Sequence, residues 1–418
     1  MVALRTARRP ALGKMLVRES YIAAPLLFLV VFLSLGGMVK FGPAMPASWA
    51  LVYLVGFSWF VFTPLRTASL WFKFWPLLLL PAIALISMAW SANPAATFRT
   101  GFQFAFSTLL AIRIATAITA RQAIWCLFLG TTLGCALSVA AFVLPPLQPA
   151  FESNGAFVGI FVQKTVAGVA LTLFVLSLCA QGALWGHRIL AVLLALTVMP
   201  LLAMTHSISA MVLLSCSSLI IFQGVFARWT AGARLSLLLL LVALCGTWLL
   251  ILWVGEFDIV AFGLDLVGKS TTLTGRTDIW DLGIQVAKDH PVLGVGYAAF
   301  WENPAFAVEW GFLHATVDPR LKGFHNAYIE AFATTGLISV ILLVFVYYWT
   351  MLKAGRWFIE SCSVQSAFWL AIIVSALLLS FVDNVLFAEH EFFHIAATLA
   401  FVFATVEREK YQWTFRVS

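Results

Sequence analysis

Charged side chains are scarce in this sequence. Only 10% of the 418 residues are Asp, Glu, Lys or Arg, whereas 62% are hydrophobic. A soluble domain averages about 25% charged residues, so this chain has too few of them to cover a surface that faces water. The composition therefore excludes a cytosolic enzyme, a secreted domain and a nucleic-acid-binding protein, and the same apolar content excludes disorder.

Cysteine is also rare. The six cysteines all lie in predicted membrane spans or on the predicted inner side: Cys126, Cys135, Cys179, Cys216, Cys245 and Cys362. None forms a C-x-x-C pair and none lies in a long outer loop, which excludes a disulfide framework and a zinc site of that spacing. We interpret them as small apolar packing residues.

Long apolar runs dominate the chain instead. A membrane helix needs about 20 mostly apolar residues, and twelve stretches meet this requirement. They cover residues 22–39, 47–63, 74–90, 101–118, 123–144, 165–183, 189–204, 208–226, 235–254, 327–350, 366–382 and 387–406. Proline blurs several ends, so eleven and thirteen spans are the alternatives. The predicted fold is an all-α polytopic membrane bundle, and its first run is too long for a cleaved signal peptide.

Lysine and arginine are distributed unevenly between the two sides of this bundle. With the N-terminus inside, 17 of the 25 basic residues fall on the inner side. An excess of Lys and Arg in cytoplasmic segments is the usual signal of membrane orientation. The net charge of +7 therefore indicates topology and not a nucleic-acid surface. Both termini are predicted to be cytoplasmic.

One outer connection is much longer than the others. It divides the chain into an N-terminal bundle, an outer loop and C-terminal spans with a tail: residues 1–254, 255–326 and 327–418. A long loop rich in charge is expected to carry function. Within it, residues 277–289 space their apolar side chains at helical intervals. This pattern is typical of a helix lying on the membrane surface.

Three segments in and after this loop follow one another in a distinctive order: GRTDIW (275–280), HPVLGVGY (290–297) and HNAYIEAFATTGL (325–337). This succession resembles the core signature of the bacterial O-antigen ligase and Wzy-type polysaccharide polymerase superfamily. Within that superfamily it is most similar to ExoQ-type exopolysaccharide polymerases.

Weaker similarities to this superfamily run along the chain. They are AWSANPAATFRTG (89–101), GIFVQKTVAG (159–168) and FVDNVLFAEHEFF (381–393), the last where members have an acidic residue before the final span. Two positions depart from the pattern. Thr165 stands where Asn usually follows Lys164, and Ile208 stands where a second Arg is common. The second departure removes one expected cation from the phosphate site, for which Lys164 or His206 could substitute.

The resemblance implies a GT-C-like enzyme at the outer, periplasmic face of the bacterial inner membrane. Such an enzyme is a metal-independent inverting glycosyltransferase without a cofactor. Its donor is an undecaprenyl-diphosphate-linked oligosaccharide, and it polymerises the repeat units into an exopolysaccharide or O-antigen. The alternative is an O-antigen ligase that transfers the glycan to lipid A-core. Membrane lipids, a chain-length regulator and a flippase are the expected partners.

This reaction requires a cation for the departing diphosphate and a base for the acceptor hydroxyl. Arginine offers phosphate a fixed fork of donors, and histidine titrates near the working pH. The catalytic candidates are therefore Arg276 and His325. The substrate-binding candidates are further polar residues of the outer segments: Lys164, Arg99, Lys322, Glu330 and His206.

Each candidate also has a structural alternative. Arg276 could cap the surface helix or anchor it to lipid headgroups, and Lys164 could be an interface anchor. His325 could be only a turn residue before a helix that Asn326 caps. Glu330 lies in the first turns of a span, where a carboxylate is unfavourable unless paired. It is expected to orient His325 or to pair with Lys322.

A literal H-E-x-x-H motif, HEFFH (390–394), points to a different class of enzyme. On a helix, His390 and His394 would share one face and bind zinc, with Glu391 as base and Asp383 as a third ligand. That arrangement would make an intramembrane zinc protease. The alternative is a polar helix start that faces an outer cavity and binds no metal, which is the interpretation favoured here. A secondary transporter is a third class, but no internal repeat supports it.

Overall fold

The computed structural model describes residues 3–225, 276–301, 303–316 and 321–417. Over these residues the only β pairing is an isolated bridge between Phe151 and Phe157. The α-helices are α1 (Ala3–Ser34), α2 (Ala44–Phe62), α3 (Pro64–Lys73), α4 (Leu79–Ile86), α5 (Pro94–Ala115), α6 (Ala120–Ala140), α7 (Lys164–Trp185), α8 (Arg188–Met204), α9 (Ile208–Val225), α12 (Arg276–Asp289), α13 (Ala307–Thr316), α14 (Ala327–Ser361), α15 (Val364–Leu379) and α16 (Phe392–Val417). The prediction of an all-α polytopic membrane protein is confirmed.

Eleven of the twelve predicted spans overlap a described helix, and the remaining one, 235–254, lies outside the described residues. Among the described helices, α2, α6, α7 and α14 are long and apolar enough to cross a membrane. The shorter apolar helices include α8, α15 and the part of α1 from Glu19 to Ser34. The total of twelve spans stays a prediction, as does the domain boundary at residue 254. The five cysteines in the described residues are free.

The predicted span 74–90 is not one straight helix. α3 ends before Phe74, and the following segment, Trp75–Ala89, is turned by 89° against it. This segment consists of α4 between the 3-10 helices η2 (Trp75–Leu78) and η3 (Ser87–Ala89). Pro76 lies in the first turn of η2, where it has no N–H to continue a helix from α3. The apolar run is long enough for a span, but it does not reveal this bend.

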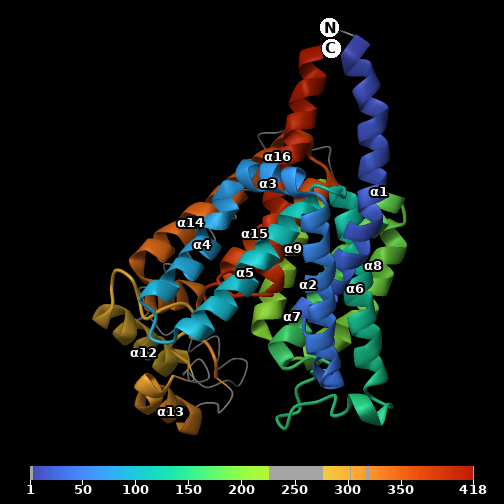
Figure 1. The fold of residues 1–418 in the computed structure, drawn as a ribbon. Coiled ribbons are helices and arrows are strands. Elements are labelled where there is room, and N and C mark those ends of the chain that lie inside the picture. The colour runs from blue at the N-terminus through green and yellow to red at the C-terminus, as the bar shows by residue number, and fades with distance from the viewer. Residues whose placement is uncertain (1–2, 226–275, 302, 317–320, 418) are drawn as a thin grey trace.

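Both chain ends lie at the same end of the bundle, where α1 begins and α16 ends (Figure 1). The helices α12 and α13 lie at the opposite end, together with the connection between α6 and α7 (Figure 1). The termini therefore share one side, in agreement with the predicted topology. That this side faces the cytoplasm stays a prediction from the basic residues.

A buried ion cluster joins α5 to α1 and α3. Arg113 is fully buried, and its guanidinium donates two hydrogen bonds of 2.8 and 3.2 Å to the carboxylate of Glu19. Arg66 pairs with the same carboxylate at 2.8 Å, and Arg113 stacks 4.3 Å from the ring centre of Trp59. A cation in a membrane bundle persists only when it is paired. Arg113 is therefore part of the architecture and not of an open site.

The helix α12 packs on protein. Its side chains Ile279, Val286 and Ala287 are buried in a small core with Phe324. A Cβ at Gly283 would come within 2.5 Å of the Ile329 side chain, so glycine allows α12 to approach α14 closely. The predicted helix is confirmed. Of the predicted apolar face, Ile279 and Ala287 are buried against protein, whereas Ile284 is exposed. That this helix lies on the membrane surface stays a prediction.

Candidate active site

The kink of α14 and the segment 290–297 form one backbone unit. Gly336 inside α14 has a φ of +77°, and Val295 N–H donates to the carbonyl of Ala333 at 3.1 Å beside it. A Cβ at Gly336 would lie 2.0 Å from the carbonyl oxygen of Val292. Only glycine fits there, both for its φ and for the space. The segment 290–297 is thereby held against α14.

The segment 89–101 joins this unit from the other side. Trp90 Nε1 donates to the Leu293 carbonyl at 2.8 Å, and Ala92 N–H donates to the Val295 carbonyl at 2.9 Å. Asn93 then caps α5, because its Oδ1 accepts a hydrogen bond from Ala96 N–H at 3.2 Å. Three of the segments that carry the family resemblance are therefore connected in space.

The connection between α15 and α16, residues 380–391, is tied to the start of α14. Asn326 caps α14, since its Oδ1 accepts hydrogen bonds from Tyr328 and Ile329 N–H at 3.0 and 3.1 Å. Its side-chain amide donates to the Phe381 carbonyl at 3.0 Å. Ala327 N–H donates to the carbonyl of Ser380 at 2.9 Å. The cap predicted at Asn326 is confirmed, and it also aligns His325 with this connection.

His325 and Asp383 face each other across that junction. His325 Nδ1 lies 3.1 Å from Asp383 Oδ1, and about a third of each side chain is exposed, 32% and 29%. His325 has a φ of +49°, a conformation that non-glycine residues adopt infrequently and that is often found at functional sites. His325 is therefore more than a turn residue before α14, because its imidazole has a carboxylate partner and remains accessible.

Asp383 determines which ring nitrogen of a neutral His325 carries the proton. Burial opposes ionisation of Asp383, but the hydrogen bond from His325 and the charges of His325 and Arg276 outweigh it and lower the pKa of Asp383. An ionised carboxylate only accepts hydrogen bonds, so the proton of a neutral His325 lies on Nδ1. Its Nε2 is then left as a proton acceptor, which is the form a general base requires.

Arg276 is the first residue of α12 and is partly buried. Burial lowers its pKa, and the nearby charge of Asp383 acts in the opposite direction. The guanidinium nevertheless stays charged at any working pH. Asp383 therefore contacts His325 directly and experiences the charge of Arg276, so both predicted catalytic candidates act on one carboxylate.

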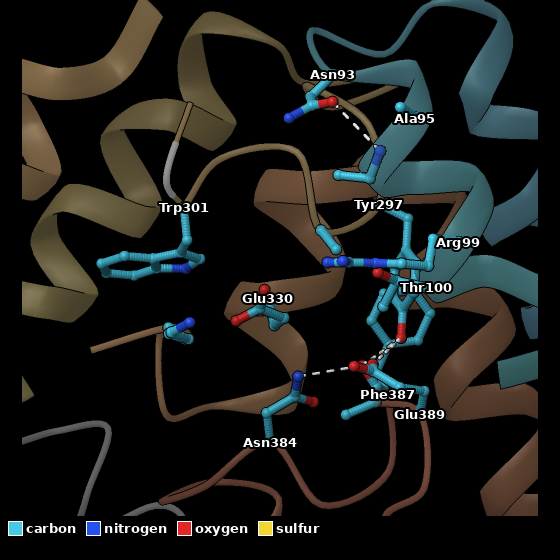
Figure 2. A pocket seen from close by; sticks show the side chains of 14 residues that line it. Asn93, Ala95, Arg99, Thr100, Tyr297, Trp301, Glu330, Asn384, Phe387 and Glu389 are labelled. Atoms are coloured by element: carbon cyan, nitrogen blue, oxygen red, sulfur yellow. Dashed lines mark hydrogen bonds between the residues drawn. The ribbon is translucent and has the colours of Figure 1, made fainter. Parts of the chain in front are cut away.

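The structure has a cavity of about 570 Å³, and two of its lining residues, Lys322 and Asn384, lie close in the chain to His325 and Asp383. Figure 2 shows the side chains that line it. They come from Asn93 and α5, from the segment after Gly296, from Lys322 and the first turn of α14, and from the connection 380–391. Its lining includes three of the predicted substrate-binding residues: Arg99, Lys322 and Glu330. The other polar or aromatic lining residues are Asn93, Thr100, Tyr297, Trp301, Asn384, Phe387 and Glu389.

Glu330 fixes the turn that carries His325. Its side chain is buried, and its Oε2 accepts a hydrogen bond of 2.8 Å from Phe324 N–H. It therefore holds the backbone immediately before His325. Its described hydrogen bond is to this backbone and not to the imidazole. The expectation that Glu330 orients His325 or pairs with Lys322 stays a prediction.

Two acidic residues of the connection 380–391 are poorly predicted by sequence. The zinc motif indicates Asp383 only as a third ligand, and the family's segment 381–393 does not single out Asp383 or Glu389 as its acidic residue. Tyr297 donates a hydrogen bond of 3.4 Å to Glu389 Oε2, and burial is the main reason that the pKa of Glu389 is raised to about 6. The one useful signal is the family's acidic residue before the final span, which corresponds to this connection.

Lys164 and His206 do not line the cavity. Lys164 begins α7, and its backbone N–H donates to Glu152 Oε1 at 3.1 Å. His206 lies between α8 and α9 and has a φ of +50°. The two elements meet where Gly168 approaches Ser207. The structure therefore brings together the elements that carry these two candidates, and neither candidate lines the cavity.

The geometry required of the HEFFH motif is absent. α16 begins only at Phe392, and His390 before it has a φ of +60°. His390 stacks on Trp49 at 3.8 Å and lies 2.6 Å from Tyr53 Oη. The assumption that both histidines share one helix face is therefore wrong.

Both ring nitrogens of His394 have hydrogen-bond partners within the bundle. Its Nε2 lies 2.8 Å from Thr108 Oγ1, and its Nδ1 lies 2.7 Å from Tyr347 Oη. Both ring nitrogens thus have hydroxyl partners in the bundle interior. Among the residues that the structure describes, no three His, Cys, Asp or Glu side chains are grouped as metal ligands.

The chain resembles known proteins of polysaccharide synthesis. Residues 189–344 match the family model described as O-Antigen ligase. Over 285 residues the chain is 28% identical to the exopolysaccharide production protein ExoQ of Rhizobium meliloti (strain 1021). That match covers 63% of this chain and 61% of the relative. The family resemblance expected from the motifs is confirmed.

Proposed function

We propose that this relative of the O-antigen ligase family is a glycosyltransferase that polymerises lipid-linked glycan repeat units at the outer face of a bacterial inner membrane. The observation that carries the proposal is the His325–Asp383 pair, whose carboxylate also experiences the charge of Arg276. Arg276 is the first residue of α12, and α12 lies at the end of the bundle opposite the termini (Figure 1). A base and a cation at that end match the requirements of a lipid-diphosphate donor. The orientation is part of the proposal and places both termini in the cytoplasm.

His325 acts as the base in this mechanism. Its Nε2 takes the proton of an acceptor hydroxyl while that oxygen attacks the anomeric carbon of the donor. Asp383 holds Nδ1–H and stabilises the imidazolium that forms. The bond between the anomeric carbon and the diphosphate oxygen breaks with both electrons going to the diphosphate. A single displacement of this kind inverts the anomeric configuration.

Arg276 stabilises the departing diphosphate. Negative charge grows on the leaving group in the transition state, where a pre-placed guanidinium is most effective. Two parallel N–H donors match two phosphate oxygens. Lys164 and His206 on the neighbouring elements are assigned to the lipid-diphosphate as further partners.

Polymerisation and ligation differ only in the acceptor. A polymerase uses another lipid-linked repeat unit, and an O-antigen ligase uses lipid A-core. The similarity to an exopolysaccharide production protein supports polymerisation. A flippase that delivers the donor and a chain-length regulator are the partners that this activity would require.

The test uses purified full-length protein in proteoliposomes with a lipid-linked repeat unit as the only glycan. The parent protein is expected to produce a ladder of polymer lengths. His325→Ala should slow chain growth by about 10²–10⁴-fold, the usual contribution of a general base, and single lipid-linked repeats should accumulate. His187→Ala is the matched control, because His187 is exposed in the turn between α7 and α8. Unchanged polymer from His325→Ala would show that the base lies elsewhere.

Arg276 is tested by a charge-conserving change. Arg276→Lys should be nearly as inactive as Arg276→Ala, because a point charge does not replace a bidentate fork. Arg188→Lys, at an exposed position at the start of α8, is the control. Full activity of a normally inserted Arg276→Ala protein would refute the assignment.

A further inference from the structure

The helix α3 has an apolar stripe and a polar stripe side by side. Leu65 and Phe72 lie seven residues apart, and so on one face of the helix, and they are 87% and 80% exposed. The polar side chains of Arg66, Ser69 and Lys73 follow the neighbouring face at the same helical spacing. A helix that combines an apolar face with a basic one is typical of the boundary between lipid headgroups and acyl chains.

The orientation of α3 fits such a position. The segment that follows it, Trp75–Ala89, is turned by 89° against α3. A helix at right angles to a membrane-crossing segment lies along the membrane plane. With 10 residues, α3 is also too short to cross a bilayer. It lies towards the end of the bundle that carries both termini (Figure 1).

Four cations gather where the C-terminal parts of α3, α14 and α16 meet. This basic cluster consists of Lys73, Lys353, Arg356 and Arg408. Lys353 experiences the charges of the other three cations and, with opposite sign, that of Glu409. Lys73 pairs with Glu409 at 2.8 Å, and Arg408 pairs with Glu360 at 2.5 Å. The acidic side chains of these helix ends are Glu360, Glu407 and Glu409. The cations therefore outnumber the carboxylates beside the polar stripe of α3.

Aromatic rings lie beneath the basic cluster. The ring centre of Phe401 is 6.4 Å from that of Phe74 and 5.7 Å from that of Trp349. Lys353 Nζ lies 4.8 Å from the ring centre of Phe401 and donates a hydrogen bond of 3.2 Å to the hydroxyl of Thr405. Its stem thus rests on apolar surface while the ammonium reaches a polar group, as lysines do at a membrane interface.

An anionic phospholipid matches this combination of features. Its phosphate accepts hydrogen bonds from guanidinium and ammonium groups, and its acyl chains cover an apolar stripe. Basic residues between membrane helices are a recurring form of headgroup site. A small soluble anion would use the cations alone and leave Leu65 and Phe72 uncovered.

We propose that α3 and the adjoining ends of α14 and α16 form a binding site for an anionic phospholipid. Lys353 and Arg356 hold the phosphate, and Leu65 and Phe72 contact the acyl chains. Lys353 lies towards the opposite end of α14 from His325, so this site is separate from the candidate active site. The proposal does not depend on the glycosyltransferase function.

The first experiment titrates full-length protein in dodecyl maltoside with phosphatidylglycerol that carries a fluorescent NBD group on one acyl chain. NBD-phosphatidylcholine is the neutral counterpart. Phosphatidylglycerol should bind saturably and more tightly. Lys353→Gln/Arg356→Gln should weaken its binding about 30-fold, at about fivefold for each basic residue near an anionic headgroup. Binding of phosphatidylcholine should not change.

Arg121→Gln/Arg188→Gln is the matched control, because it removes two exposed cations at the starts of α6 and α8. It should bind phosphatidylglycerol as the parent does. Arg356 is exposed, so Arg356→Gln alone, with about fivefold weaker binding expected, keeps the test decisive if the double variant fails to fold. Equal affinity for the two lipids, or unchanged affinity in the cluster variants, overturns the site. Release of the probe by soluble glycerol phosphate as effectively as by unlabelled phosphatidylglycerol also overturns it.

The second experiment tests the apolar stripe by cysteine labelling in phosphatidylglycerol nanodiscs. Leu65→Cys and Ser69→Cys are introduced singly after the six native cysteines are replaced. Both positions are exposed, so a difference between them must come from the lipid. Ser69→Cys should react with a membrane-impermeant maleimide, whereas Leu65→Cys should be protected. Equal labelling rates would show that α3 does not lie in the membrane interface and would refute the proposal.

Discussion

His325 and Asp383 are 58 residues apart in the chain, yet His325 Nδ1 lies 3.1 Å from Asp383 Oδ1. The contact exists because Asn326 and Ala327, at the start of α14, bind the carbonyls of Phe381 and Ser380. These two hydrogen bonds hold the start of α14 against the connection 380–391 and thereby position His325 opposite Asp383. This relationship makes Asp383 a positioning residue for the base.

Asp383→Asn should lower the transfer rate by about 10²–10⁴-fold, because an amide no longer selects the Nδ1–H tautomer or stabilises the imidazolium. Donor binding should persist, since Arg276 is untouched. The rates are measured in proteoliposomes over a range of pH, and Asp383→Glu should restore part of the activity. Asp278→Asn, at an exposed position on α12, is the control. An Asn variant with the parent's rate and pH profile would remove Asp383 from the mechanism.

The membrane spans are predictable from sequence for a simple physical reason. A run of about 20 apolar residues has no other stable place than a membrane or a buried core. The structure departs from straight spans where a residue changes the backbone, as in the bend at Pro76 and the kink at Gly336. Hydropathy does not register either of them, because both residues lie inside otherwise continuous apolar runs.

The site is only partly predictable. Arg276 and His325 lie in motifs, so their residue types indicate their chemistry. Asp383 and Trp301 become meaningful only through contacts between distant segments, which sequence periodicity does not encode. The HEFFH motif shows the reverse case. Its spacing is that of a zinc helix, but the chain adopts a positive φ at His390 and starts the helix after it.

The topology is tested by labelling single cysteines in a background whose six native cysteines are replaced. Asp278→Cys on α12 and Arg356→Cys near the end of α14 are both at exposed positions. Position 278 should react with a membrane-impermeant maleimide added outside intact spheroplasts, and position 356 should react only after lysis. Labelling of position 356 from outside would invert the topology and exclude a periplasmic site.

Chelation distinguishes the transferase from the zinc hydrolase that the HEFFH motif suggests. The proposed mechanism assigns charge stabilisation to Arg276, so transfer should continue at the parent's rate after dialysis against EDTA. Elemental analysis of the purified protein should find far less than one zinc per chain. About one zinc per chain, lost together with activity on chelation and absent from His390→Ala protein, would contradict the assignment.

Glu389 provides a prediction about pH and stability. Its pKa is raised to about 6, chiefly by burial, whereas an unperturbed glutamate titrates near 4.3. The folded protein therefore binds this proton more tightly than the unfolded chain does. The stabilising contribution is fully present below about pH 4.3 and is lost as the pH rises through about 6. At pH 8 the carboxylate is charged in a site that disfavours charge.

Glu389→Gln should consequently stabilise the protein at pH 8 by about 1–2 kcal/mol, the free-energy equivalent of the shift after allowance for partial exposure. Gln can still accept the hydrogen bond from Tyr297, so that contact does not confound the comparison. Denaturation in mild detergent at pH 8 and pH 4 measures the difference, which should vanish at pH 4. Glu309→Gln, at an exposed position on α13, should match the parent at both pH values. A Glu389→Gln protein less stable than the parent at pH 8 would show that the ionised carboxylate is stabilised by its surroundings, and that Arg99 outweighs the effect of burial.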